Sequence, residues 1–125
     1  MSTVTHLECG LSGERLPAGQ LATVSAVGKP LLVRYDLDRI RREVDRDAIA
    51  ARAATLWRWR ELLPLPAGVE PVSLGEDATP LLPLPALSAA CGVEVVAKDE
   101  GRLPTASFKA RGLAMAVNMA RHFGV

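Results

Sequence analysis

The hexapeptide Ser107-Phe108-Lys109-Ala110-Arg111-Gly112 opens the last helical stretch of the chain and decides how the preceding segments are interpreted. At about 100° per residue, a helix over residues 108–123 has one polar stripe, made of Arg111, Asn118, Arg121 and His122. Lys109 falls on the opposite side of the wheel, among small and apolar residues. This lysine is therefore predicted to point towards the core.

An inward orientation would favour an uncharged amine on Lys109. The helix macrodipole disfavours a positive charge at the helix start by roughly 0.3–1 kcal/mol, and burial against apolar neighbours disfavours it further. A neutral lysine amine attacks carbonyl groups and forms Schiff bases. In the alternative interpretation, Lys109 lies in a frayed first turn and extends to water over its apolar stem. Spacing alone favours that alternative.

Composition limits the classes of function. The 125 residues have the length of one domain, and 49% hydrophobic content is enough for a core. A net charge of +1 and 4% aromatic residues predict neither a nucleic-acid nor a membrane-surface partner. No signal peptide or membrane-spanning run is found, and Cys9 and Cys91 are far apart without ligand spacing. These features predict a cytoplasmic protein with reduced thiols and no bound metal.

The first half of the chain is expected to be a small hairpin followed by short helices. Residues 1–20 are interpreted as loop, and two β-prone runs, 21–27 and 31–35, are interpreted as an antiparallel hairpin. Asp36 or Asp38 is expected to cap a first helix. Two further helices are expected at about 48–54 and 55–63, followed by a proline-rich connector at 64–72.

The second half is expected to contain one strand–helix unit. After a turn-rich loop at 73–81, a helix over 84–91 should end at Gly92. The valines of 93–98 predict a buried strand, and Ser107 is a reasonable N-cap for a final helix that ends at Gly124. A parallel strand needs flanking partners. Because the sequence offers none, the chain is expected to stop in the middle of a fold.

Several motifs occur in an order that is typical of one enzyme family. They are Ser73-Leu74-Gly75-Glu76, Thr79-Pro80-Leu81, Lys98-Asp99-Glu100-Gly101, Pro104-Thr105 and the hexapeptide, preceded by Val33-Arg34-Tyr35-Asp36-Leu37 and the tryptophan-rich run 56–64. Together these pieces resemble the N-terminal portion of threonine synthase, in the tryptophan-synthase-β-like group of pyridoxal phosphate enzymes.

The resemblance implies an α/β fold: the N-terminal part of a fold-type II pyridoxal phosphate enzyme, with an incomplete parallel sheet and a helical arm. Residues 1–66 would be the arm, and 67–125 the truncated start of the catalytic domain. Pyridoxal 5'-phosphate would be covalently bound to Lys109, with Phe108 and Ser107 beside it. Arg111 is expected to be a structural charge, and Thr79 and the 100–105 loop would line the site entrance by analogy.

The implied reaction is the lyase chemistry of threonine biosynthesis, in which O-phospho-L-homoserine and water give L-threonine and phosphate. The full-length enzyme would be a homodimer acting on a small amino-acid substrate. In the family, further cofactor-binding groups lie beyond the equivalent of Val125. The chain alone is therefore expected to be an inactive fragment.

The sequence departs from the family pattern at several positions. Asp77-Ala78 replaces the usual Gly-Asn, and Leu103 and Ala106 stand where Asn and Gly are common. Cys9-Gly10 lacks the paired cysteines that form a zinc ribbon in some relatives, so no metal is expected. Two alternatives remain open. One is a related enzyme, such as cysteate synthase, threonine or serine dehydratase, or diaminopropionate ammonia-lyase; the other is a non-catalytic truncated remnant.

Overall fold

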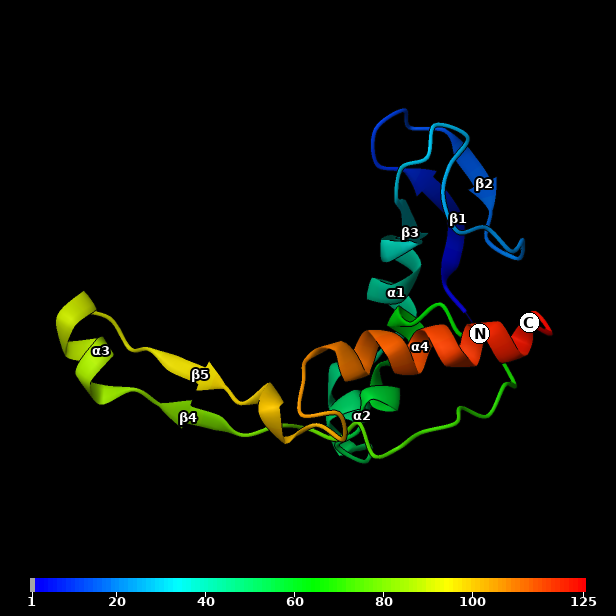
Figure 1. Cartoon of the computed structure of the whole chain (residues 1–125). Coiled ribbons are helices and arrows are strands. Elements are labelled where there is room, and N and C mark those ends of the chain that lie inside the picture. The colour runs from blue at the N-terminus through cyan, green and yellow to red at the C-terminus, as the bar shows by residue number, and fades with distance from the viewer. Residues whose placement is uncertain (1) are drawn as a thin grey trace.

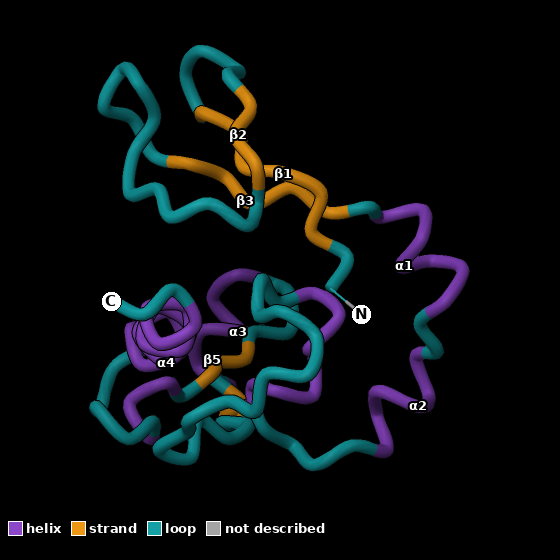
Figure 2. Tube along the Cα trace, turned by 90° about the vertical axis from the view of Figure 1, so that its right-hand side faces the viewer, coloured by secondary structure: helices purple, strands orange, loops and turns teal. Residues whose placement is uncertain are grey.

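The N-terminal part of the protein is a three-stranded antiparallel sheet. The structure is a computed structural model that describes residues 2–125. The sheet has the order β2-β1-β3 and lies above the C-terminal helix (Figures 1 and 2). Its strands are β1 (Val4–Cys9), β2 (Arg15–Pro17) and β3 (Leu31–Tyr35).

The predicted hairpin of residues 21–27 with 31–35 is wrong in its first half. Strand β3 pairs with β1 instead, with Val33 opposite Leu7, so the segment 1–20 that was expected to be loop contains two strands. Residues 21–27 form turns: the Ser25 N–H donates to the Lys29 carbonyl at 3.0 Å, and the Lys29 N–H donates to Ser25 Oγ at 3.1 Å. These local bonds occupy groups that a strand would offer to a partner.

Three short helical segments follow the sheet, close to the predicted ranges. They are α1 (Leu37–Glu43), α2 (Arg46–Ala51) and the 3-10 segment η1 (Leu56–Leu62). Of the two candidate caps, Asp36 and Asp38, the structure has Asp36, whose carboxylate accepts the Arg39 N–H at 2.8 Å. The Arg52 guanidinium forks onto Glu61 with two bonds of 2.8 Å and joins the end of α2 to η1.

A thin hairpin of residues 81–98, which we call the apolar arm, projects away from the rest of the molecule (Figure 1). It consists of β4 (Leu81–Pro83), α3 (Pro85–Cys91) and β5 (Val96–Lys98). Helix α3 ends at Gly92 with φ 71°, as predicted. The expectation of a buried strand over 93–98 is wrong, since β5 is shorter and mostly exposed.

The expected parallel sheet is also absent from the part of the chain that the structure describes. Strand β5 pairs with β4, which runs antiparallel to it, and the N-terminal strands are antiparallel as well. The two pairs belong to separate small sheets. The coarser prediction of a mixed α/β chain is confirmed.

The last helix, α4 (Lys109–His122), follows the short 3-10 turn η2 (Glu100–Arg102). It ends as predicted at Gly124, which adopts φ 71°. The Gly124 N–H donates to the Arg121 carbonyl at 3.1 Å and the Val125 N–H to the Ala120 carbonyl at 2.9 Å. This pair of bonds is the Schellman motif that closes many helices.

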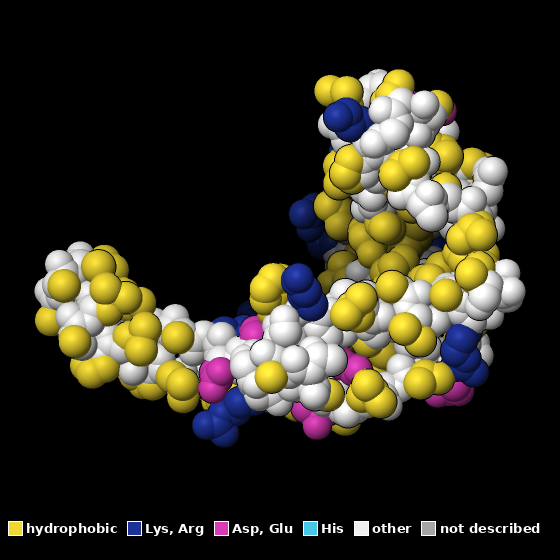
Figure 3. All heavy atoms as spheres, viewed as in Figure 1, with side chains coloured by type: hydrophobic (Ala, Val, Ile, Leu, Met, Phe, Trp, Pro, Cys, Tyr) yellow, Lys and Arg dark blue, Asp and Glu magenta, His cyan; other side chains and the backbone are white. Residues whose placement is uncertain are grey.

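The core is small and contains polar as well as apolar side chains. The buried residues are Cys9, Ile49, Leu65, Leu103 and Ala110, together with the polar Thr3, Ser25, Glu76 and Asn118. A cavity of about 510 Å³ lies between the N-terminal sheet and the end of α4, where Figure 3 shows a hydrophobic hollow. Among residues 2–125, no helix combines the length and apolar character needed to cross a membrane.

Candidate functional site

The start of α4 is built around Ser107. The Ser107 hydroxyl accepts the Lys109 N–H at 3.3 Å, and the Ser107 carbonyl accepts the Ala110 N–H at 3.1 Å. The cap residue is Phe108, one position later than predicted, but the hydroxyl that satisfies a free helix amide is the predicted one. Ser107 is half-buried, whereas the side chain of Phe108 is 69% exposed.

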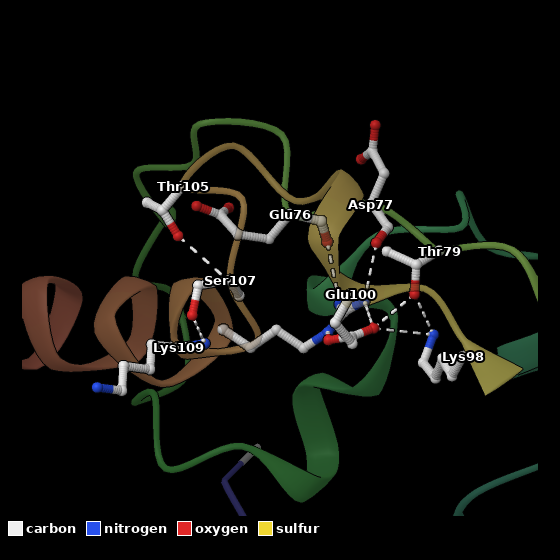
Figure 4. Close-up of polar contacts among 9 residues, drawn as sticks. Glu76, Asp77, Thr79, Lys98, Glu100, Thr105, Ser107 and Lys109 are labelled. Atoms are coloured by element: carbon white, nitrogen blue, oxygen red, sulfur yellow. Dashed lines mark hydrogen bonds and ion pairs between the residues drawn. The ribbon is translucent and has the colours of Figure 1, made fainter.

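The Lys109 side chain points away from the interior. The residue is exposed, and Figure 4 shows the amine projecting outward from the first turn of α4. Its neighbours on the same side, Gly112, Leu113 and Ala116, are also exposed. The prediction that Lys109 faces the core is therefore wrong for this chain.

The inward face of α4 carries two residues of the polar stripe, Arg111 and Asn118, beside the buried Ala110, whereas Arg121 and His122 of the stripe are exposed. Asn118 is only 1% exposed. Its Oδ1 accepts the Val72 N–H at 2.7 Å, and its Nδ2 donates to the Val72 carbonyl at 2.8 Å and to the Ala114 carbonyl at 2.8 Å. Fully satisfied amide groups are tolerated in a core. The amphipathic pattern of the sequence was correct, but it was assigned to the opposite face.

Arg111 joins the same stripe to two other segments. Its guanidinium forks onto Glu100, with Nε 2.8 Å from Oε2 and Nη2 3.0 Å from Oε1. It also donates to the Glu76 carbonyl at 3.5 Å and to the Asp77 carbonyl at 3.0 Å. The prediction of a structural charge at Arg111 is confirmed.

The Glu100 carboxylate is the centre of a polar cluster (Figure 4). It accepts the Thr79 hydroxyl at 2.5 Å and lies 3.2 Å from the Lys98 ammonium, which also donates to Thr79 Oγ1. Hydrogen bonds from Arg111, then from Thr79 and Lys98, lower the pKa of Glu100 to about 2. Glu100 is therefore ionised at neutral pH.

Sequence reasoning missed the role of Glu76. This residue is 3% exposed, and its carboxylate accepts the Ser73 hydroxyl at 2.5 Å and the Leu74 N–H at 3.2 Å. Its carbonyl accepts the Leu56 N–H at 2.8 Å. The signal was the spacing Ser-x-x-Glu, which is typical of a capping box.

Thr79 and the turn after β5 line one cavity. It measures about 460 Å³, and its lining includes Thr79, Pro80, Arg102 and Leu103. The structure thus brings together the two loops that were expected to border a site entrance. Lys109 lines neither this cavity nor the 510 Å³ one.

No group of three or more His, Cys, Asp or Glu side chains suited to a metal ion occurs among the described residues. Cys9 is 2% exposed and lies 3.1 Å from Ser25 Oγ. Hydrogen bonding with Ser12, and then with Ser25, lowers the pKa of the Cys9 thiol to about 7. Cys91 is free and exposed.

The described residues fit one part of a pyridoxal phosphate site. Covalent attachment needs an accessible amine, and within residues 2–125 the Lys109 amine has no hydrogen-bond or ion-pair partner. The ring and phosphate also need an enclosing pocket with backbone donors, and the exposed face of α4 encloses neither. The residues present therefore fit the linkage but do not surround the ring.

Comparison with known proteins finds a family model that is similar to the second half of the chain. Residues 72–123 match the model described as "Pyridoxal-phosphate dependent enzyme". This segment, which is less than half of the chain, is similar to that family. No solved structure matches the chain.

The chain is also similar to a portion of several threonine synthases. It is 32% identical over 118 residues to threonine synthase of Methanocaldococcus jannaschii, covering 94% of this chain and 29% of the relative. It is 31% identical over 122 residues to that of Methanosarcina acetivorans, with 96% and 29% covered. It is 45% identical over 69 residues to threonine synthase of Halalkalibacterium halodurans, covering 55% of this chain and 20% of the relative. The chain thus spans less than a third of the length of these relatives.

Proposed function

We propose that the chain is the cofactor-attachment portion of a threonine synthase-like enzyme of the tryptophan-synthase-β-like fold. Residues 1–66 form the arm in this proposal, and 67–125 begin the catalytic domain. The observation that carries it is the similarity to threonine synthases over 94% of the chain, together with an accessible Lys109 at the start of α4. Cytoplasmic location and a homodimeric full-length enzyme remain predictions.

Each residue of the helix start has a stated role in this proposal. Lys109 carries pyridoxal phosphate covalently and moves protons at Nζ, while Ser107 orients the first turn through the Lys109 N–H. The exposed ring of Phe108 would lie beside the cofactor. When bound, pyridoxal phosphate would supply an electron sink for the conversion of O-phospho-L-homoserine and water to L-threonine and phosphate.

The 125 residues alone are proposed to lack turnover, because the described residues do not enclose the ring or phosphate. Turnover therefore has to be tested in a chimera in which this chain replaces the matching portion of the Methanocaldococcus jannaschii enzyme. Threonine and phosphate formed from O-phospho-L-homoserine would support the synthase, and a Lys109→Ala chimera should form neither. Oxo acid formed from threonine or serine would indicate the dehydratase alternative instead.

A non-catalytic interaction domain is the second candidate. The specific observation in its favour is the exposed apolar side of α4, on which Leu113 is 56% and Val117 is 52% exposed. This candidate predicts no preference of pyridoxal phosphate for Lys109. The chimera distinguishes it from the enzyme, since a folded chimera without turnover would favour the interaction domain.

A further inference from the structure

Helix α4 is held with two polar side chains, Arg111 and Asn118, inward and with apolar side chains exposed, which departs from the usual arrangement of an amphipathic surface helix. These two side chains form hydrogen bonds with the main chain of one segment, residues 72–77. Asn118 binds both main-chain groups of Val72, and Arg111 binds the carbonyls of Glu76 and Asp77. These contacts span 46 residues from Asn118 and 34 residues from Arg111 along the chain.

The two side chains that make these hydrogen bonds lie on the same side of the helix. Arg111 and Asn118 are seven residues apart, which is about two turns at 3.6 residues per turn. Lys109 and Arg111 differ by two positions, or roughly 160° around the axis at 100° per residue. A helix fixed through Arg111 and Asn118 therefore turns Lys109 away from the 72–77 segment.

Apolar packing alone does not determine this orientation. The Lys109 side of α4 carries Leu113, Ala116 and Val117, all of them exposed, and burying such side chains would stabilise the opposite rotation. The specific polar bonds oppose that tendency, because a buried amide or guanidinium that loses its partners costs free energy. The Glu100 fork adds a third restraint on Arg111.

We propose that Arg111 and Asn118 are positioning residues that set the rotation of α4 and thereby keep the Lys109 amine outside, open to an aldehyde cofactor. This inference rests on the proposed function for its purpose, but its geometry can be tested without the cofactor. It assigns no contact with substrate or cofactor to either residue.

The experiment compares the reactivity of two lysines in the full chain. A general amine-acylating reagent is applied briefly, and the acylation of Lys109 is divided by that of the exposed Lys29, which lies in a distant turn. In the Arg111→Met/Asn118→Leu variant both sides of α4 are apolar. If the two rotations become equally populated, the Lys109/Lys29 ratio falls to about half or lower.

Arg121→Met is the matched control. Arg121 lies on the same helix, is exposed, and its side chain has no partner within residues 2–125. Its removal should leave the ratio unchanged. Arg111→Lys keeps the charge without the fork, so its ratio should lie between those of the parent and the double variant. An unchanged ratio in a double variant that stays folded by circular dichroism overturns the inference.

A second measurement tests the proposal if the double variant does not fold. Hydrogen exchange of the Val72 amide, which donates to Asn118, should accelerate in Asn118→Leu while the Ala110 amide in the first turn of α4 stays protected. In that case the Arg111→Lys variant tests the proposal, and a Lys109/Lys29 acylation ratio equal to that of the parent overturns it.

Parallel labelling with pyridoxal phosphate separates the two claims. If acylation depends on Arg111 and Asn118 but pyridoxal phosphate shows no preference for Lys109 in the parent chain, the positioning inference stands and the proposed function fails. If pyridoxal phosphate selects Lys109 equally in the parent and the folded double variant, the positioning inference fails and the function stands.

Discussion

At the scale of single residues, Glu100 shows how one carboxylate can join three segments. It receives Arg111 from α4, Thr79 from the loop before β4, and Lys98 from the end of β5. The place of Arg111 on the polar side of the helical wheel indicated a structural charge from the sequence, but its partner was not identifiable. Arg111 and Glu100 are 11 residues apart and are joined by an irregular loop, so no periodic pattern in the sequence indicates that they pair.

This cluster predicts a specific loss of stability in acid. The pKa of Glu100 lies below that of an unfolded glutamate, so its stabilising effect is complete above about pH 4.3 and is lost as pH falls towards its folded value of about 2. Urea unfolding of the parent and Glu100→Gln should differ most at neutral pH and converge between these limits. A difference that stays constant down to pH 2 would contradict the assigned pKa.

Ala106 is held in a conformation that suits glycine. It has φ 51°, while its N–H donates to the Leu103 carbonyl at 2.7 Å. The left-handed region costs a residue with a Cβ roughly 1–2 kcal/mol, whereas glycine adopts it freely. Ala106→Gly should raise the free energy of unfolding by about 1 kcal/mol after the entropic cost of glycine.

The control for Ala106→Gly is Ala116→Gly, at an exposed position inside α4. This change should lower the free energy of unfolding by about 1 kcal/mol, because glycine is a poor helix former. Equal destabilisation by both substitutions would argue against strain at Ala106.

At the scale of elements, signals carried by neighbouring residues were predicted well. The Asp36 cap, the Gly92 and Gly124 helix ends and the ranges of the short helices depend on local chemistry, and the structure confirms them. Pairing of β1 with β3 was missed because the partners lie far apart in sequence. The face of α4 was assigned wrongly because the partners of Asn118 and Arg111 lie 34 to 46 residues away.

The first helix offers a direct test of one local signal. Asp36→Ala removes the carboxylate that accepts the Arg39 N–H and should cost about 1 kcal/mol of unfolding free energy. Asp38→Ala is the matched control, since Asp38 is 79% exposed and only pairs with Arg41 at the surface. It should change stability by less than about 0.5 kcal/mol. Similar losses in both variants would contradict the cap.

At the scale of the whole molecule, the exposed apolar surface is the main feature. The apolar arm exposes Leu81, Val93 and Val96 by 62%, 62% and 47%, and neither edge of its two-stranded sheet is paired within residues 2–125. Unpaired apolar edges promote association. We expect the apparent mass in light scattering to rise with protein concentration.

A charge on the arm should reduce this association. Leu81→Lys places an ammonium on the edge of β4 and should lower the concentration dependence without changing the unfolding midpoint. Leu11→Lys is the control, since Leu11 is 69% exposed in the turn between β1 and β2, and Figure 1 shows these strands far from the arm. An equal effect of both substitutions would indicate a general charge effect rather than pairing through the arm.

The candidate site was predictable from the sequence only in part. The hexapeptide motif indicated Lys109 and Ser107 because the chemistry of the family is carried by adjacent residues. The burial argument for Lys109 failed, since the wheel gives the sides of a helix but not which side packs inward. Asn118 was missed because its role depends on main-chain partners, which no side-chain motif reveals. The role of Glu76 was missed although the Ser-x-x-Glu spacing was a signal for it.

The most direct test of the account is reductive labelling with pyridoxal phosphate. The chain has three lysines, Lys29, Lys98 and Lys109, so borohydride reduction followed by peptide mapping assigns every label on a lysine side chain. The account predicts that the label accumulates on Lys109 well above the exposed Lys29, and that Lys109→Ala removes the excess. Labelling of Lys109 at no more than the level of Lys29 would contradict it.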